Sequence, residues 1–479
     1  MAEGLMSDEA RNNIRPDHDE VELTRDMTLF QILMIGVGAM IGAGIFVLTG
    51  TASGEAGPAV LVAFLLNGLI AFMTGSIYAE LGAMMPAAGG GYVWIHRSVG
   101  GLPGFLAGWI SWFGHSVACS LYAVAFAHYT AAALAGPHEP VLGMPPEVFS
   151  KVAAVFSIAL FGYINFRGAS ETGKAEAVVT IGKLIVLGLF VLSGFLVLKD
   201  RPHWQQQFQP FAPNGLTGIF GAMGVIFIAF QGYEIVAQSG EEVVNPKRNV
   251  PKAILWSVGV VLVVYLLVAF VSIAAVTGPE GTPSWRYLDS LKELGIVEAA
   301  RQFMIGGPVF GRLLLLIGGL FSTASALNAT IYSSSRVAYA MSRDANLPDS
   351  LSAIHPATRT PHVALVVSLV IIAAMAILLP LETVASAADI MFLLLFVAIA
   401  GVALVLRKRR PDADRAFKAP WFPVLPIVAV LCQFGLAAHL FSFSPISWLV
   451  SGGWLVAGGI IFFTYSRRRQ LARAHTPVA

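Results

Sequence analysis

The chain has 479 residues, of which 56% are hydrophobic and 12% charged, and its mean hydropathy is +0.73. Soluble globular chains carry roughly 25% charged residues, so this composition excludes an ordinary soluble domain and indicates an integral membrane protein. The formal net charge of +2 says little by itself, and we expect no nucleic-acid partner. Cys119 and Cys432 lie in apolar runs without metal spacing, so neither a metal nor a cofactor is expected.

Residues 1–26 are polar and mixed in charge, and they lack the apolar core of a signal peptide. We predict a cytoplasmic N-terminal tail there and a second cytoplasmic tail over 467–479. Because a bilayer core of about 30 Å needs about 20 apolar residues per helix, the runs between the tails predict twelve transmembrane helices in an all-α protein. They cover 27–50, 58–84, 102–133, 147–166, 172–198, 215–239, 251–277, 309–341, 363–380, 386–406, 421–441 and 446–466.

The first span is irregular, because its centre reads GAMIGAGIFVLTG over 38–50. Glycine inside a helix costs about 1 kcal/mol relative to alanine in water. The sixth span has a matching irregularity, with Gln231 and Gly232 in its middle. Irregular segments at matching positions of two halves are typical of inverted-repeat transporters, in which the breaks form the binding site. The alternative is close helix packing through small residues.

Broken membrane helices expose backbone groups that suit an amino acid. A half-helix N-terminus favours a carboxylate, and carbonyls freed at a half-helix C-terminus favour an ammonium group. We therefore predict backbone N–H donors at Ile41, Gly42, Ala43 and Gly44, with Ile45 as an apolar neighbour, and carbonyl acceptors at Phe227, Ile228, Ala229 and Phe230.

Lysine and arginine are concentrated in the loops that face the same side as the N-terminus, most densely over 407–418 and 467–473. By the positive-inside rule, both termini are expected in the cytoplasm of a cell-membrane protein. The longest connection on the opposite side is 278–308. A short helix over the external mouth is predicted from the near-helical spacing of Tyr287, Leu288, Leu291, Leu294 and Val297.

Four segments together resemble the amino acid–polyamine–organocation permeases: GAMIGAGIFVLTG with EAGPAV, YAELGAMMPAAGGGYVW, IAFQGYEIVAQSGEEVVNPKRNVPKAI, and SSSRVAYAMSRDANLP. The likeness is strongest to bacterial relatives of the cationic amino acid transporters. It implies a LeuT-like five-plus-five inverted repeat with helices 1 and 6 broken, plus two additional C-terminal helices. The halves would be 27–198 and 215–406, followed by 421–466.

Two ionisable residues inside spans are candidates for proton coupling. Lys183 lies about eleven residues into the fifth span, so about 16 Å deep. The resemblance places it where sodium-coupled relatives bind sodium, which implies that its proton is exchanged during transport. The alternative is a fixed positive charge that binds carbonyls of the first span. Glu234 follows the second break and is interpreted either as a proton or substrate sensor or as a helix cap.

Other polar residues have weaker assignments. Glu80 and Arg336 suit an internal gate, although loop anchoring for Glu80 and a headgroup contact for Arg336 fit equally well. His115 and Ser120 are candidate substrate-cavity residues that could instead join helices, and His115 could also relay protons. Relatives with cationic substrates often carry glutamate at the position of Gly114, so the sequence favours neutral amino acids. Further candidates for the cavity are Ser322, Ser325 and Asn328.

The sequence therefore predicts a secondary active amino acid permease. An enzyme is not expected, since the chain shows no HExxH pair and no GxSxG elbow, and ATP drive is not expected, since it shows no Walker lysine motif. It also lacks the charged rings and filter loops of a channel. Alternating access with proton symport is the leading mechanism, and exchange of cationic amino acids or polyamines is the alternative. The expected partners are an amino acid, a proton and the lipid bilayer. A monomer is expected, with an oligomer left open.

Overall fold

The computed structural model describes residues 27–474 apart from 87–88, 136–139, 168–171 and 241–242. The predicted cytoplasmic tail over 1–26 lies outside the described residues, as does the end of the second tail. The described chain is built from helices, and its strand-like pairing is limited to two isolated bridges, Met27 with Val243 and Val141 with Met144.

The longer helices follow the predicted spans. They are α2 (Leu29–Met40), α3 (Ala43–Ala56), α4 (Val60–Met84), α6 (Gly101–Leu134), α7 (Pro146–Arg167), α8 (Thr172–Leu198), α9 (Gly215–Ile226), α11 (Pro246–Ala275), α14 (Pro308–Arg343), α15 (His362–Leu378), α16 (Leu381–Arg409), α17 (Val424–Phe443) and α18 (Pro445–Ile461). Shorter helices connect or extend them: α5 (Gly90–Val99), α10 (Tyr233–Gln238), α12 (Ser284–Ser290), α13 (Gly295–Phe303) and α19 (Arg467–Ala474).

Ten helical segments of the described chain are long and apolar enough to cross a membrane. One of them, Leu29–Met84, joins α2, α3 and α4 in a run of 56 residues, and the shorter apolar helix His362–Leu378 is counted separately. Large apolar side chains such as Phe156, Leu431 and Leu449 are exposed on the outside of the bundle. An apolar exterior is what a lipid environment requires, so the chain is a multi-pass membrane protein.

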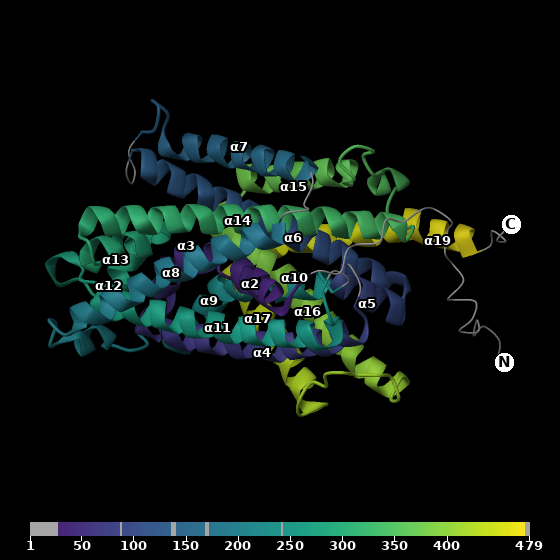
Figure 1. Ribbon diagram of the computed structural model, residues 1–479, viewed down its shortest axis with the longest axis horizontal. Helices are drawn as coiled ribbons and strands as arrows, with labels where there is room; N and C mark the ends of the chain where they lie inside the picture. Colours follow the sequence, from purple (N-terminus) through teal and green to yellow (C-terminus); the bar gives the residue numbers. More distant parts are fainter. Residues whose placement is uncertain (1–26, 87–88, 136–139, 168–171, 241–242, 475–479) are drawn as a thin grey trace.

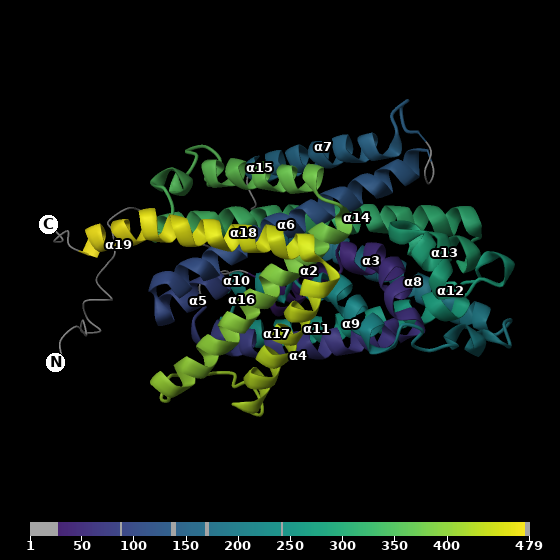
Figure 2. The same ribbon diagram turned by 180° about the vertical axis from the view of Figure 1, so that it is seen from behind.

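The helices lie in a bundle along the longest axis of the molecule (Figure 1). The long helix α14 packs against α6, and α11 packs against α4. Helices α7 and α15 run side by side along one flank in both views (Figure 2). Helices α12 and α13 lie at one end of the bundle, and α5 and α19 lie at the other.

Two of the membrane segments are interrupted where the sequence predicts. Between α2 and α3, Ile41 has ψ 66° and Gly42 has φ −101° and ψ −138°, so neither continues the helix. Between α9 and α10, the chain passes through the 3₁₀ turn η3 (Phe227–Phe230), an extended Gln231 and a Gly232 with φ 142°. Residues with a side chain avoid that last conformation, so the second interruption requires glycine.

The connection over 278–308 is helical, but it forms two helices instead of the single short one expected. Helices α12 and α13 are separated by the 3₁₀ turn η5 (Lys292–Leu294). This segment lies against α3, where a side chain at Gly50 would come within 2.8 Å of the carbonyl oxygen of Leu288. Lys292 adds ion pairs to Asp289 at 3.0 Å and to Glu382 of α16 at 3.8 Å.

Candidate functional site

The two interrupted segments contact each other at the centre of the bundle. A Cβ at Gly44 would lie 2.6 Å from the Cα of Ala229, closer than real Cβ contacts come, so only glycine permits this approach. On the other side, a Cβ at Gly232 would lie 2.8 Å from the backbone nitrogen of Met40. The backbones of η3 and of the α2–α3 break are therefore neighbours, and a group that binds to one also lies close to the other.

Tyr265 of α11 connects the two breaks. Its hydroxyl lies 2.7 Å from the carbonyl oxygen of Met40 and 2.9 Å from that of Ala229. A phenolic hydroxyl has a single proton, so it donates to the two oxygens in competition or shares the proton between them. Both oxygens belong to helix ends that have lost their regular partners, and Tyr265 satisfies them in a buried position.

The beginning of α3 is free of a side-chain cap. Gly42 holds the N-cap position without a capping hydrogen bond, and its own N–H turns back to the carbonyl of Met40 at 2.7 Å. The first N–H groups of any helix lack partners within the helix, and the dipole makes this end attractive to an anion. Apolar side chains surround it, since Ile41, Ile45 and Phe230 are all buried. The ring of Phe230 packs against that of Tyr265 at 5.1 Å.

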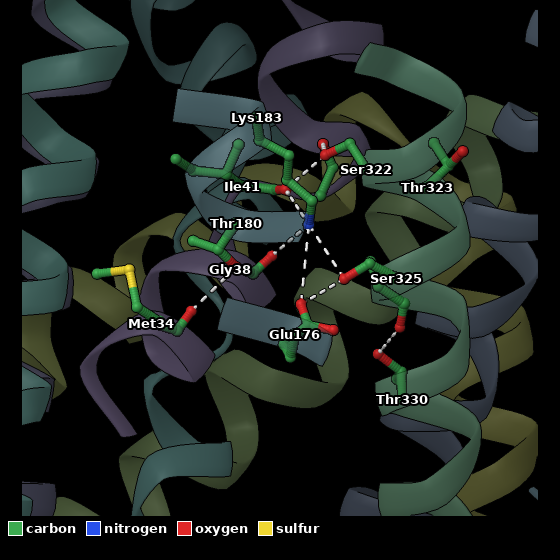
Figure 3. A network of polar contacts seen from close by, with 12 residues as sticks. Met34, Gly38, Ile41, Glu176, Thr180, Lys183, Ser322, Thr323, Ser325 and Thr330 are labelled. Carbon is green, nitrogen blue, oxygen red and sulfur yellow. Dashed lines mark hydrogen bonds and ion pairs between the residues drawn. The ribbon is translucent and has the colours of Figure 1, made fainter. Parts of the chain in front are cut away.

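Lys183 of α8 points into the first break (Figure 3). Its Nζ donates to the carbonyl oxygens of Gly38 at 3.1 Å and Ile41 at 3.3 Å, and to the hydroxyl of Ser325 at 3.1 Å. Glu176, about two turns earlier on the same face of α8, lies 3.9 Å from the same nitrogen and accepts a hydrogen bond from Ser325. The lysine thus satisfies carbonyls that the break exposes, as the fixed-charge interpretation also requires.

Ser322 of α14 completes the contacts to this break. Its hydroxyl donates to the carbonyl of Ile41 at 2.5 Å and lies 3.2 Å from that of Gly42. A tyrosine of α6, Tyr122, approaches from a third side, because its ring would lie 3.4 Å from a Cβ at Gly42. Helices α6, α8, α11 and α14 therefore all contribute to holding the irregular backbone.

The second break has its own buried polar groups. Glu234 accepts a hydrogen bond from the backbone N–H of Gly232 at 2.8 Å, which is the contact that the capping interpretation expects. Gln231 donates to Asp389 of α16 at 3.1 Å. One oxygen of Gln231 and one of Asp389 are buried without a partner in the described chain. Buried polar atoms without partners are rare, so this pair is a candidate extension of the site.

Two expected cavity residues face other helices. His115 is buried against the ring of Phe392 at 5.1 Å, with its Nδ1 2.7 Å from the carbonyl oxygen of Ser111. Its Nε2 is buried without a partner among the described residues. Ser120 donates to the carbonyl of Ile372 in α15 at 2.9 Å, so it joins α6 to α15. This hydrogen bond involves neither of the two helix breaks.

Comparison with known proteins identifies the family of the chain. A family model described as amino acid permease matches residues 27–463, which includes both breaks and every helix that holds them. The chain belongs to the amino acid permease family. As the relatives are named permeases and transporters, this permease is a membrane transporter and not an enzyme.

Individual relatives cover nearly the whole permease. A branched-chain amino acid permease of Bacillus subtilis is 32% identical over 458 residues, which is 94% of each chain. A methylthioribose transporter of the same species is 29% identical over 94% of this chain and 95% of its own. The mouse cationic amino acid transporter 4 is 29% identical over 85% of this chain and 65% of its own.

The two residues expected at a gate lie in different parts of the permease. Glu80, near the end of α4, accepts hydrogen bonds from Arg407 at 2.7 and 2.8 Å and from the backbone N–H of Ala419 at 2.8 Å. These contacts are those of an anchor for the α16–α17 loop. Arg336 borders a small hollow between α7, α14 and α15 and lies 4.6 Å from the Tyr332 ring.

Sequence reasoning missed three residues that the structure brings to the site: Tyr265, Glu176 and Asp389. Each left a signal in the sequence. Tyr265 and Asp389 interrupt otherwise apolar runs, VVLVVYLLVAF and ADIMFLLLF. Glu176 precedes Lys183 by seven residues, which is nearly two turns of a helix, so the spacing places both side chains on one face.

Proposed function

We propose that this permease is a secondary active transporter that moves amino acids across the cell membrane by alternating access. The observation that carries the proposal is the contact of the two helix breaks, Gly44 against Ala229, within a chain of the amino acid permease family. Breaks of this kind supply an anion-binding helix end and freed carbonyls next to each other.

The binding mode follows from the polarity of those two groups. The substrate carboxylate would accept hydrogen bonds from the N–H groups of Ala43 and Gly44, at the uncapped beginning of α3. Its ammonium group would donate to carbonyl oxygens of Phe227, Ile228, Ala229 and Phe230. Of the other predicted residues, Ile45 would border the substrate side chain together with Ile41. We leave Ser120 out of this set because its hydroxyl is committed to α15.

Neutral, branched apolar amino acids are the proposed substrates. Buried apolar side chains surround the breaks, and the relative that is 32% identical is named for branched-chain amino acids. Cationic amino acids, handled by exchange, are the second candidate, since a cationic amino acid transporter is among the relatives. The carboxamide of Gln231 and the carboxylate of Asp389 would bind the charged side chain of such a substrate.

The architecture we propose has twelve spans in a LeuT-like five-plus-five inverted repeat, with both termini in the cytoplasm. The repeats would be 27–198 and 215–406, and the two additional helices would lie within 421–466. Support comes from the interruptions at matching places of the two halves and from the arginines and lysines of 407–418 and 467–473. Proton symport through Lys183 is part of the proposal, supported by its burial against the break.

A thermal-stability screen of the purified permease against the twenty amino acids, methylthioribose and several polyamines tests the substrate class. A ligand that binds only the folded state raises stability by about 2.7 kcal/mol at one hundred times its Kd. We expect the largest increase in melting temperature with leucine, isoleucine or valine. If only polyamines or methylthioribose raise it, the proposed class is wrong.

A further inference from the structure

Glu176 shares one face of α8 with Lys183, the lysine bound to the first helix break (Figure 3). The two charged atoms lie 3.9 Å apart, which is too far for a direct hydrogen bond. Ser325 of α14 lies between them. Its hydroxyl accepts from Lys183 Nζ at 3.1 Å and donates to Oε1 of Glu176, so the three side chains form a continuous chain of hydrogen bonds.

The surroundings of this chain are otherwise neutral. Helix α2 presents the carbonyl oxygens of Gly38 and Ile41, α14 presents the hydroxyls of Ser322 and Ser325, and α8 itself adds the hydroxyl of Thr180. Within the described chain, Lys183 and Glu176 form no ion pair with any further residue. Gly38 allows Glu176 to come close, because a Cβ there would lie 2.8 Å from Oε1.

The two ends of the chain differ in their access to water. The Lys183 side chain is 1% exposed, whereas that of Glu176 is 11% exposed. Glu176 is the fifth residue of α8, close to the helix end that the proposed orientation places in the cytoplasm. A proton that leaves the buried lysine therefore has a route to solvent through the serine and the carboxylate.

We propose that Glu176 and Ser325 form the proton relay that connects Lys183 to the cytoplasm. In the relay step, Lys183 Nζ gives a proton to Ser325 Oγ while the serine proton passes to Glu176 Oε1. The ammonium group becomes an amine, the carboxylate becomes a carboxylic acid, and the serine is unchanged. Glu176 then releases the proton to water on the cytoplasmic side. This inference rests on the proposed proton coupling through Lys183.

The relay also gives the transport cycle a charge change at the break. With Lys183 protonated, an ammonium group binds the carbonyls of Gly38 and Ile41 and holds α2 against α8. A neutral amine is a weaker donor, since hydrogen bonds from charged groups are roughly twice as strong as neutral ones. Proton transfer to Glu176 would thus loosen the contact between α2 and α8.

The test compares two transport modes of the full-length protein in proteoliposomes, with radiolabelled leucine as the probe. Uptake driven by a pH gradient needs net proton movement, whereas counterflow at equal pH needs only substrate binding and exchange. We expect Glu176→Gln and Ser325→Ala to lower pH-driven uptake at least tenfold and to leave counterflow within twofold of wild type. Glu176→Asp should restore part of the driven uptake. Thr180→Val is the matched control, because the Thr180 hydroxyl donates to the carbonyl of Met34 and, among the described residues, bonds to no member of the relay.

Each other outcome contradicts the relay. If Glu176→Gln or Ser325→Ala retains pH-driven uptake while Lys183→Ala loses it, the relay is wrong and the role of Lys183 stands. If both modes fall together in these variants but not in Thr180→Val, the carboxylate and hydroxyl have a structural role and no relay exists. If uptake by the wild-type protein does not depend on the pH gradient, the proposed proton coupling is wrong, and the relay is wrong with it.

Discussion

The hydroxyl of Tyr265 forms hydrogen bonds to both helix breaks. It is buried, as are Met40 and Ala229, whose carbonyl oxygens accept its hydrogen bonds. The carbonyl of Met40 also accepts from the N–H of Gly42, so loss of the phenolic proton mainly leaves the carbonyl of Ala229 without a donor, and an unsatisfied buried acceptor costs free energy. One phenolic proton thus couples the positions of two segments that are separated by almost two hundred residues.

Tyr265→Phe removes this hydroxyl and keeps the ring that packs against Phe230. Interhelical hydrogen bonds in membrane proteins contribute on average about 0.6 kcal/mol and at most about 1.7 kcal/mol, so we expect a loss of about 1 kcal/mol. The free energy of unfolding in an SDS titration measures it. Tyr163→Phe is the control, since that tyrosine is exposed on α7. Equal stability of the two variants would show that the bridge is energetically unimportant.

At the scale of elements, Glu80 determines how the α16–α17 loop is held against α4. Its carboxylate is 3% exposed and receives hydrogen bonds from Arg407 and from the backbone of Ala419, and Arg415 lies 3.2 Å away. Two arginines share one buried carboxylate, so removal of its charge would leave both without their acidic partner. Breaking a buried ion pair from one side costs about 3–5 kcal/mol.

We therefore expect Glu80→Gln to destabilise the permease by about 3 kcal/mol. This is the lower end of the range, because Arg407 is 22% exposed and solvent can partly replace its lost partner. The melting temperature in detergent measures this loss. Asp414→Asn tests the same loop at the exposed Lys247–Asp414 pair, where we expect no measurable change. A Glu80→Gln protein as stable as Asp414→Asn would contradict the anchoring role.

On the scale of the whole molecule, the sequence predicted the helices and the positions of both breaks, because apolar length and glycine pattern are local properties. Of the helices that hold the breaks, it indicated only α8, through the interpretation of Lys183 as a fixed charge on carbonyls of the first span. Tyr265, Glu176 and Asp389 lie in α11, α8 and α16, and only the packing of those helices brings them to α2 and η3. Ser120 shows the converse, since its residue type fits a cavity while its neighbours place it against α15.

Gly44 is the residue at which the first helix break packs against the second, so the proposed amino acid site depends on it. A methyl group there would collide with Ala229 and would separate the N–H groups of α3 from the carbonyls of η3. Gly188 of α8 is the matched control, because a Cβ at that position meets nothing within 4 Å. Both substitutions add the same methyl group to a membrane helix.

Equilibrium binding of radiolabelled leucine to purified wild type, Gly44→Ala and Gly188→Ala tests the central claim most directly. Elution as a single peak from size-exclusion chromatography confirms that each protein is folded. We expect wild type and Gly188→Ala to bind leucine alike, and Gly44→Ala to bind it at least tenfold more weakly. Unchanged binding by a folded Gly44→Ala protein would contradict the claim that the two breaks form the amino acid site.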